Sequence, residues 1–96
     1  MKLVWLPSAV ADLQGLRAYI AEHDPQAARA VAQKIRTSVA YLKAHPRLGR
    51  PTDVDEIRQM SVPNLPYLIP YRVQDGRIEI LRVFHTAQEQ PENWEE

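Results

Sequence analysis

The hydrophobic period of this chain changes near its middle, and that change constrains the fold more than any other feature. Before residue 45, apolar residues recur every three or four positions, which is typical of helices with one buried face. After residue 56 they alternate with other residues, which is typical of strands. A chain of 96 residues is long enough for one core but not for two. The sequence therefore predicts a single α+β domain over residues 1–96.

The N-terminal segment predicts a short strand followed by a helix. Residues 2–6 are apolar and β-prone, and Pro7 ends them. We expect Ser8 to cap the helix through its hydroxyl, with Asp12 in the first turn, where the helix dipole favours an anion. The helix is expected to end near His23, and its buried face carries Ala9, Leu13, Leu16 and Ile20.

A second helix is predicted to start directly after the first. Asp24 can accept hydrogen bonds from the first backbone N–H groups, and Pro25 suits the first helical position, where an N–H has no partner. The two helices should therefore fold back as an antiparallel hairpin. The second helix ends at His45-Pro46, and its expected buried residues are Ala28, Val31, Ile35, Val39 and Leu42.

The second half of the chain predicts a loop and three strands. Residues 47–55 are rich in Gly, Pro and Asp, whereas residues 57–62, 67–73 and 77–85 have strand periodicity. The predicted order is β-α-α-β-β-β. We expect the helical hairpin to pack on one face of a small, twisted, mostly antiparallel sheet.

The register of the last hairpin has two solutions. A two-residue turn at residues 75–76 pairs Arg72 with Glu79, but it places Pro70, which has no N–H, at a hydrogen-bonded position. A longer turn with a glycine bulge shifts the pairing by one residue and places Arg72 and Arg82 on the same face. We predict the bulged register.

Charge is unevenly distributed, although the net charge is zero. After His85 the remaining charged residues are all acidic. Such a sided surface suits an acidic partner, although solvation of an exposed face is the better explanation for each charge taken alone. Between Asp24 and Asp53 there is no acidic residue, and the basic residues are Arg29, Lys34, Arg36, Lys43, Arg47 and Arg50.

Several classes of site are not predicted. The chain has no cysteine, which excludes disulfides and thiolate zinc sites and agrees with a cytoplasmic location. It has no apolar run of about 20 residues and no signal peptide, so we expect no membrane association. Its three histidines lie in different predicted elements, without a neighbouring ligand at metal-binding spacing. We expect no metal and no cofactor.

The last strands carry the side chains that could take part in catalysis or ligand binding. His85 lies at a strand end, where an imidazole can act as an acid or base, although a structural histidine is the simpler interpretation. Arg58, Arg72 and Arg82 lie in strands and suit phosphates or an acidic peptide, or else salt bridges such as Arg72–Glu79. Tyrosines at positions 67 and 71 can stack on bases, but they more often belong to a core.

The order of short motifs resembles the RelE/ParE toxin superfamily over nearly the whole chain, and ParE-like plasmid-stabilisation toxins in particular. The pieces that carry the resemblance are Trp5-Leu6-Pro7, Asp24-Pro25, the loop His45-Pro46-Arg47-Leu48-Gly49-Arg50-Pro51, and the segments Tyr71-Arg72-Val73 and Ile80-Leu81-Arg82-Val83-Phe84-His85.

This resemblance implies the toxin of a type II toxin–antitoxin pair, neutralised by a ParD-like antitoxin in a hetero-oligomer. ParE-like members poison DNA gyrase, whereas RelE-like members cut mRNA on the ribosome. The arginine that nuclease members carry near Leu68 is missing, and no tyrosine follows His85. These two departures from the nuclease members favour a gyrase poison that is not an enzyme. The alternatives are a ribosome-dependent endoribonuclease and a degenerate, non-toxic relative that still binds antitoxin.

The expected contact residues follow from these alternatives. An endoribonuclease would use His85, Arg82 and Arg72, and the same three residues would contact the target of a gyrase poison. The residues expected to bind the antitoxin are Arg29, Arg36, Arg50, Arg58, Tyr67 and Tyr71.

Overall fold

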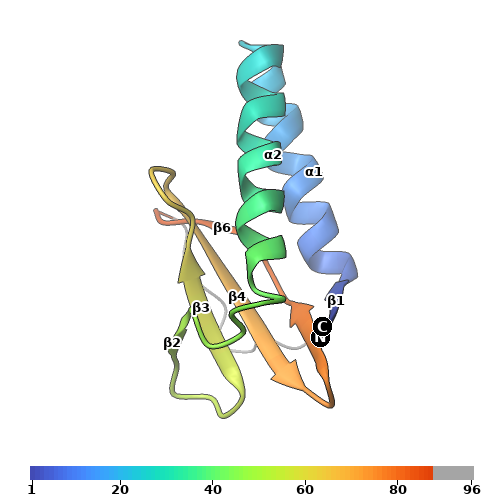
Figure 1. Ribbon diagram of the computed structural model, residues 1–96. Helices are drawn as coiled ribbons and strands as arrows, with labels where there is room; N and C mark the ends of the chain where they lie inside the picture. The colour runs from blue at the N-terminus through green and yellow to red at the C-terminus, as the bar shows by residue number, and fades with distance from the viewer. Residues whose placement is uncertain (88–96) are drawn as a thin grey trace.

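The computed structural model describes residues 1–87, so the acidic ending noted above lies outside the described part. The predicted β-α-α-β-β-β order is confirmed, with two additions (Figure 1). A two-residue strand forms inside the expected loop, and the last strand is divided in two. In chain order the elements are β1 (Lys2–Trp5), α1 (Pro7–Ala21), α2 (Pro25–Tyr41), β2 (Arg50–Pro51), β3 (Ile57–Ser61), β4 (Tyr67–Gln74), β5 (Arg77–Ile80) and β6 (Phe84–His85).

The two helices form the expected hairpin, but one of the two predicted caps is wrong. Asp24 caps α2 as predicted, because its Oδ1 accepts a hydrogen bond from the N–H of Ala27 at 3.1 Å. By contrast, α1 begins at Pro7, with Leu6 as its N-cap and no side-chain cap. Proline at the first helical position starts this helix one residue before Ser8. Asp12 consequently lies beyond the first turn.

The sheet is open and mostly antiparallel, in the order β1-β5-β4-β3-β2. The N-terminal strand β1 is parallel to β5, while the other pairs are antiparallel. Strand β6 pairs with the start of β4. In Figure 1 the base of the helical hairpin lies against one face of this sheet, and its tip extends beyond the sheet. Neither helix in residues 1–87 is long and apolar enough to cross a membrane.

The core fills the space between the hairpin and that face of the sheet. Of the residues expected from the spacing of α2, Val31 is only half-buried against the core and the others are buried, and Ala32 is buried in addition. The sheet contributes alternate residues of β4 and both isoleucines of β5. The fully buried core side chains include Ile35, Val39, Leu42, Ile69, Tyr71, Ile78 and Ile80.

The predicted register of the last hairpin is wrong. The turn has two residues, Asp75 and Gly76, with φ angles of 53° and 74°, and Arg72 pairs with Glu79. These positive φ values are those of the two-residue turns that match the twist of a hairpin.

The conflict at Pro70 is resolved at the other end of the hairpin. Pro70 accepts a hydrogen bond from the Leu81 N–H at 3.0 Å, and the β4–β5 ladder ends at Ile80 because Pro70 has no N–H to return. Pairing resumes at Leu68 with Phe84, so residues 81–83 oppose residues 69–70. The bulge therefore exists, but it lies opposite Pro70 rather than at Gly76.

Candidate functional site

A groove of about 560 Å³ separates α1 from the end of the sheet and contains the predicted histidine. We call it the His85 groove. Helix α1 forms one wall, and β4 and the strand after the bulge form the other. Its lining residues are Ala11, Asp12, Gly15, Leu16, Tyr19, Ile20, Tyr67, Val83 and His85.

His85 is placed in this groove by the pairing of β6 with β4. Its cross-strand partner is Tyr67, and the two rings meet edge to face with their centroids 5.6 Å apart. The side chain is exposed, and its Nδ1 accepts a hydrogen bond from the Ala87 N–H at 3.1 Å. In the neutral ring this bond leaves the proton on Nε2.

Tyr67 is the cross-strand neighbour of His85 and is 9% exposed. Burial raises the pKa of its phenol above the usual value of 10.0, because the phenolate would lose solvation. The group stays protonated at neutral pH. Tyr67 can donate a hydrogen bond to a ligand in the groove, but it is not suited to accept a proton as a base.

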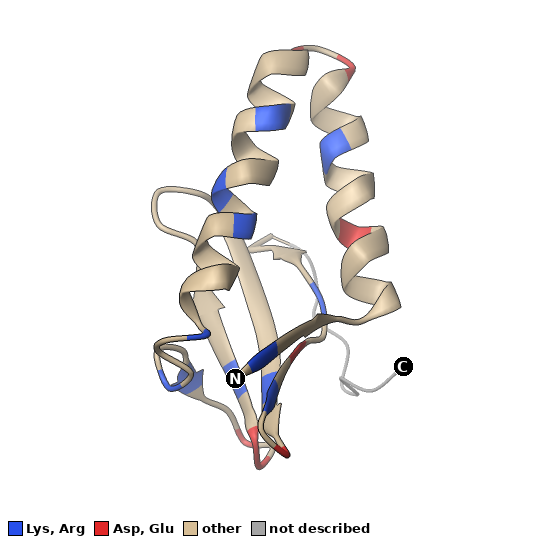
Figure 2. Ribbon diagram, turned by 45° about the vertical axis from the view of Figure 1, so that its right-hand side comes forward, with Lys and Arg blue, Asp and Glu red and all other residues tan. Residues whose placement is uncertain are grey.

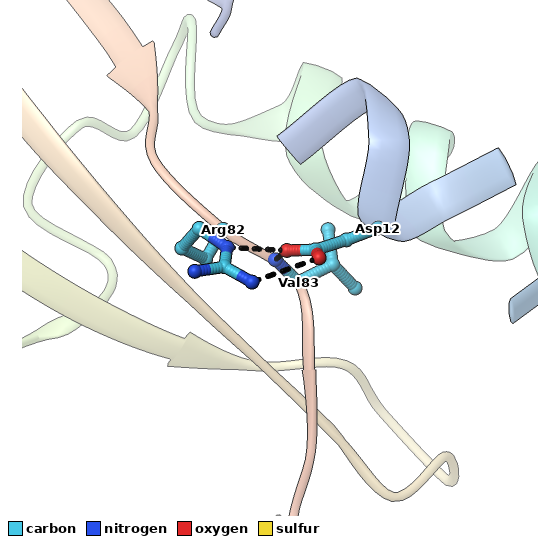
Figure 3. A network of polar contacts seen from close by, with 3 residues as sticks. All are labelled: Asp12, Arg82 and Val83. Carbon is cyan, nitrogen blue, oxygen red and sulfur yellow. Dashed lines mark hydrogen bonds and ion pairs between the residues drawn. The ribbon is translucent and has the colours of Figure 1, made fainter. Parts of the chain in front are cut away.

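Asp12 forms the polar centre of the opposite wall (Figure 3). Its carboxylate accepts a two-pronged contact from Arg82, with Nε at 2.7 Å and Nη2 at 3.0 Å, and a third hydrogen bond from the Val83 N–H at 2.9 Å. Bidentate contacts of this kind are among the stronger ion pairs in proteins. Arg82 also lies over the ring of Phe84, 4.9 Å from the centroid.

The bulge opposite Pro70 accounts for this contact. It interrupts the ladder at residues 81–83, and a bulge of this kind re-aims the side chain that it carries. Arg82 thereby reaches α1 rather than a neighbouring strand (Figure 3). The Asp12–Arg82 pair joins residues 70 positions apart and fastens the end of the sheet to the first helix.

A second charged cluster lies on β4 and β5. Glu79 accepts from Arg72 Nε at 2.7 Å and pairs with Arg77 Nη2 at 2.9 Å, and its side chain is 8% exposed. The hydrogen bond from Arg72 lowers the pKa of this carboxyl below its usual value of 4.5, and the charges of both arginines add to the effect against the cost of burial. Glu79 is therefore ionised at neutral pH.

These contacts remove the shared cationic patch that the bulged register predicted. Arg72 pairs with Glu79 on β5, and Arg82 pairs with Asp12 on α1, so each arginine has a carboxylate partner on a different element. The polar groups that line the His85 groove include the imidazole of His85, the protonated phenol of Tyr67 and the Asp12 carboxylate, which is paired with Arg82. In residues 1–87 there is no group of three metal-ligating side chains.

Comparison with known proteins identifies the family. A family model for the ParE toxin of parDE type II toxin–antitoxin systems matches residues 3–90. The chain belongs to the ParE toxin family. It is 36% identical over 91 residues to the protein Y4kP of Sinorhizobium fredii, with 95% of this chain and 94% of that protein covered. It is also 36% identical to Toxin RelE2 of Caulobacter vibrioides, over 90% of this chain and 96% of the relative.

A solved structure supports the same family. One chain of the chromosomal ParDE toxin–antitoxin system from P. aeruginosa superposes with a TM-score of 0.78 at 32% identity, covering 88% of this chain and 95% of that chain. The ParE-family fold therefore extends over the helices and the sheet together.

In this ParE-family chain the loop motif at residues 45–51 is fastened to the sheet by Tyr71. The hydroxyl of Tyr71 donates to the Pro46 carbonyl and accepts from the Gly49 N–H, each at 2.8 Å. Arg58 Nη1 donates to the Gly49 carbonyl at 2.7 Å and to the Arg47 carbonyl at 3.3 Å. The motif is therefore a structural fastening, which its resemblance alone did not indicate.

Gly49 is required by this close approach. A Cβ atom at this position would lie 2.7 Å from Tyr71 Cε1 and 3.0 Å from the backbone carbon of Gln59. Only glycine leaves room for both neighbours.

The residues expected to bind the antitoxin occupy different environments in this ParE-family fold. Tyr71 is fully buried, and half-exposed Arg58 donates a hydrogen bond to the loop. Tyr67 lies in the His85 groove. Three arginines remain exposed: Arg29 and Arg36 on α2, and Arg50 on β2 with Gln59 Oε1 at 3.5 Å.

Three structurally important residues were missed or assigned another role by the sequence analysis. Glu79 was visible as the partner of Arg72 in the register that we did not choose. Gly49 belongs to a recognisable loop motif, but the motif does not indicate that the ring of Tyr71 packs against this glycine. Asp12 had no signal for its contact with Arg82, because nothing in the sequence relates two residues so far apart.

Proposed function

We propose that this ParE-family protein is a toxin that binds and poisons DNA gyrase and is kept silent by a ParD-like antitoxin. The family membership supports the antitoxin role, and the resemblance to ParE-like rather than RelE-like members supports gyrase as the target. In this role the protein needs a binding surface and no catalytic group.

The observation that carries the proposal is the pairing of the two arginines expected to contact phosphate. Cleavage of a phosphodiester requires a base, an acid and cations that stabilise the charge developing on the phosphate. Arg72 and Arg82 each form an ion pair with a carboxylate at 2.7 Å. Their charge is therefore compensated inside the molecule, which weakens their attraction for a phosphate.

One observation favours the endoribonuclease as a second candidate. His85 and Tyr67 lie together in one groove, and both can donate a proton or a hydrogen bond there. A nuclease would need Arg82 to exchange Asp12 for the phosphate. The nuclease therefore requires the Asp12–Arg82 ion pair to open, whereas the gyrase poison does not.

The test is controlled expression without antitoxin, with separate readouts for the two targets. If gyrase is poisoned, the cells are expected to become filamentous and to show a DNA-damage response. The purified protein is then expected to inhibit supercoiling by gyrase. The endoribonuclease is expected to arrest translation rapidly and to cut ribosome-bound mRNA. His85→Ala tests the groove, and His23→Ala, at an exposed position near the hairpin tip, serves as its matched control.

The outcomes separate the candidates. Supercoiling inhibition without mRNA cleavage supports the gyrase poison, and a weaker inhibition by His85→Ala than by His23→Ala then makes His85 a contact with gyrase. Cleaved mRNA that disappears with His85→Ala, but not with His23→Ala, overturns it in favour of the nuclease. A protein without either effect, which nevertheless binds antitoxin, is the degenerate relative.

A further inference from the structure

A second groove lies between the C-terminal half of α2 and strand β3, and it shares no residue with the His85 groove. We call it the Tyr41 groove. Its volume is about 390 Å³, which falls within the range of about 300–1,000 Å³ that is usual for small-molecule sites. Its lining residues include Thr37, Ser38, Tyr41, Leu48, Met60 and Ser61.

The walls of the Tyr41 groove expose an unusual amount of apolar surface. Tyr41 and Leu48 are 55% and 54% exposed, although both are large and apolar. Met60 is 4% exposed and belongs to the core, so it forms the floor between them. A ligand placed against these side chains would remove their surface from water, which is the main driving force of association.

Tyr41 is part of an aromatic stack at the end of α2. Its ring lies against the imidazole of His45, with the centroids 4.2 Å apart and the planes 26° from parallel, and both side chains are exposed. Because Tyr41 also lines the groove, its ring offers a surface on which another flat ring can stack. Stacking of bases on exposed aromatic side chains is a principal contact of proteins that bind single-stranded nucleic acids.

The polar groups of the groove are hydroxyls. They belong to Thr37, Ser38 and Ser61, and the Thr37 oxygen accepts a hydrogen bond from the Gln33 side chain at 3.2 Å, which leaves its own proton to donate. A hydroxyl can donate and accept, and the edge of a nucleobase presents both donors and acceptors. The groove therefore combines a flat apolar surface with groups suited to a base edge.

The charge around the groove is positive. Lys34 lies on the same face of α2 as Ser38 and Tyr41, one turn before Ser38, and in the described part of the chain its ammonium group has no hydrogen bond or ion pair. Residues 25–52 and 57–74, which include every element that lines the groove, contain no Asp or Glu. Figure 2 accordingly shows Lys and Arg along α2 without an acidic residue. The ligand should therefore be an anion.

We propose that the Tyr41 groove binds an unpaired base of single-stranded DNA, with the base stacked on Tyr41 and a neighbouring phosphate beside Lys34. This inference rests on the proposed function, because the DNA is then the DNA on which gyrase acts. An acidic peptide would satisfy Lys34 equally well. The stacked rings and the hydroxyls favour a base, which is flat and carries its hydrogen-bonding groups along one edge.

The first test measures the anisotropy of a labelled single-stranded oligodeoxynucleotide of about 12 nucleotides as the full-length protein is added. Tyr41→Ala removes the stacking ring and should weaken binding about tenfold. Tyr41→Phe keeps the ring and should bind within about twofold of the wild type. Circular dichroism confirms that each variant is folded.

A second pair of variants tests the apolar wall. Leu48→Asp places a negative charge where the DNA is expected to lie and should weaken binding about tenfold. Val54→Asp makes the same change at a position of similar exposure, 45% against 54%, outside the groove. It should bind as the wild type does.

The salt dependence of binding tests the phosphate contact. Each phosphate contact on a single strand adds about 0.7 to the steepness with which the logarithm of the binding constant falls with the logarithm of salt concentration. Lys34→Gln should therefore reduce this slope by about 0.7. Lys2→Gln, at an exposed position on β1 outside the groove, is the matched control and should leave the slope unchanged.

The results separate failure of the groove from failure of the proposed function. Losses confined to the groove variants support the DNA site. Equal binding by wild type and groove variants, an equal loss in the controls, or tighter binding of an RNA strand of the same sequence overturns it. A wild-type protein that inhibits supercoiling but does not bind the oligonucleotide overturns the groove and leaves the gyrase proposal standing. One that binds the oligonucleotide through the groove but does not inhibit supercoiling overturns the gyrase proposal.

Discussion

The arginines of the sheet and those of the helical hairpin are used differently. Every arginine of β4, β5 and the bulge, together with Arg58 of β3, donates to a carboxylate or a carbonyl of the protein itself. In the helices, Arg17, Arg29 and Arg36 have no such partner within residues 1–87. The same residue type therefore stabilises the fold in one region and remains available for recognition in the other.

The largest expected effect lies at the carboxylate that pairs with two sheet arginines. Glu79→Gln should lower the free energy of unfolding at pH 7 by about 3 kcal/mol, because removing one partner of a buried ion pair leaves the other charges uncompensated. Urea denaturation measures the change. Glu22→Gln, at an exposed helix end, is the control and should cost less than about 0.5 kcal/mol. A similar loss in both variants would contradict the distinction between the two regions.

The same substitution has an expected pH dependence. The pKa of Glu79 is lower in the folded protein than its usual value of 4.5. Its contribution to stability is therefore fully present above that value and is lost as the pH falls through the lowered folded pKa. The difference between wild type and Glu79→Gln should shrink when the urea titration is repeated at pH 5, 4 and 3. A difference that stays constant would show that the charge is not its source.

Asp12→Ala should give the next largest loss, about 2 kcal/mol, since it removes three hydrogen bonds that join α1 to the bulge. The pair is partly exposed, with 32% of Arg82 and 19% of Asp12 accessible, so the expected cost is smaller than at Glu79. Asp53→Ala in the exposed loop is the control. If the two variants unfolded at the same urea concentration, the Asp12–Arg82 contact between helix and sheet would not contribute to stability.

Tyr71→Phe tests the loop fastening that the sheet provides. It leaves the Gly49 N–H and the Pro46 carbonyl without their partner, which should cost about 1 kcal/mol. Tyr41→Phe, at a tyrosine that is 55% exposed, is the matched control with little expected change. Thermal denaturation of the two variants makes the comparison, and equal melting temperatures would argue against a structural hydroxyl.

The smallest effect on stability is expected in the helices. Arg29→Ala/Arg36→Ala should change the free energy of unfolding by less than about 0.5 kcal/mol, because neither side chain has a partner to lose in residues 1–87. The same double variant should bind the antitoxin more weakly in a calorimetric titration. A loss of stability comparable to that of Asp12→Ala would contradict the view that the helix arginines, unlike those of the sheet, do not stabilise the fold.

Local structure was largely predictable from the sequence. The two amphipathic helices follow from apolar spacing, and the start of α2 follows from Asp24 and Pro25, because these signals act between near neighbours. The cap of α1 was misplaced by two residues, from Leu6 to Ser8, since Pro7 was taken as the end of a strand and not as the start of a helix.

The candidate site was less predictable. His85 and Tyr67 lie together as cross-strand partners, a contact that the sequence analysis did not predict. The roles of Arg72 and Arg82 depended on the hairpin register, and that register depended on how the chain accommodates Pro70. Sequence reasoning assigned the bulge to the glycine of the turn, whereas the protein keeps a two-residue turn and interrupts the strand beside the proline.

The sequence alone determined the elements, their order and the family, because periodicity, caps and motif spacing are properties of neighbouring residues. The tertiary structure decided which charges are neutralised. Asp12 meets Arg82 across 70 positions, and Gly49 meets Tyr71 across 22, and no local pattern encodes either contact. Electrostatic pairing falls off over a few ångströms, so it is settled only when the folded chain brings the groups together.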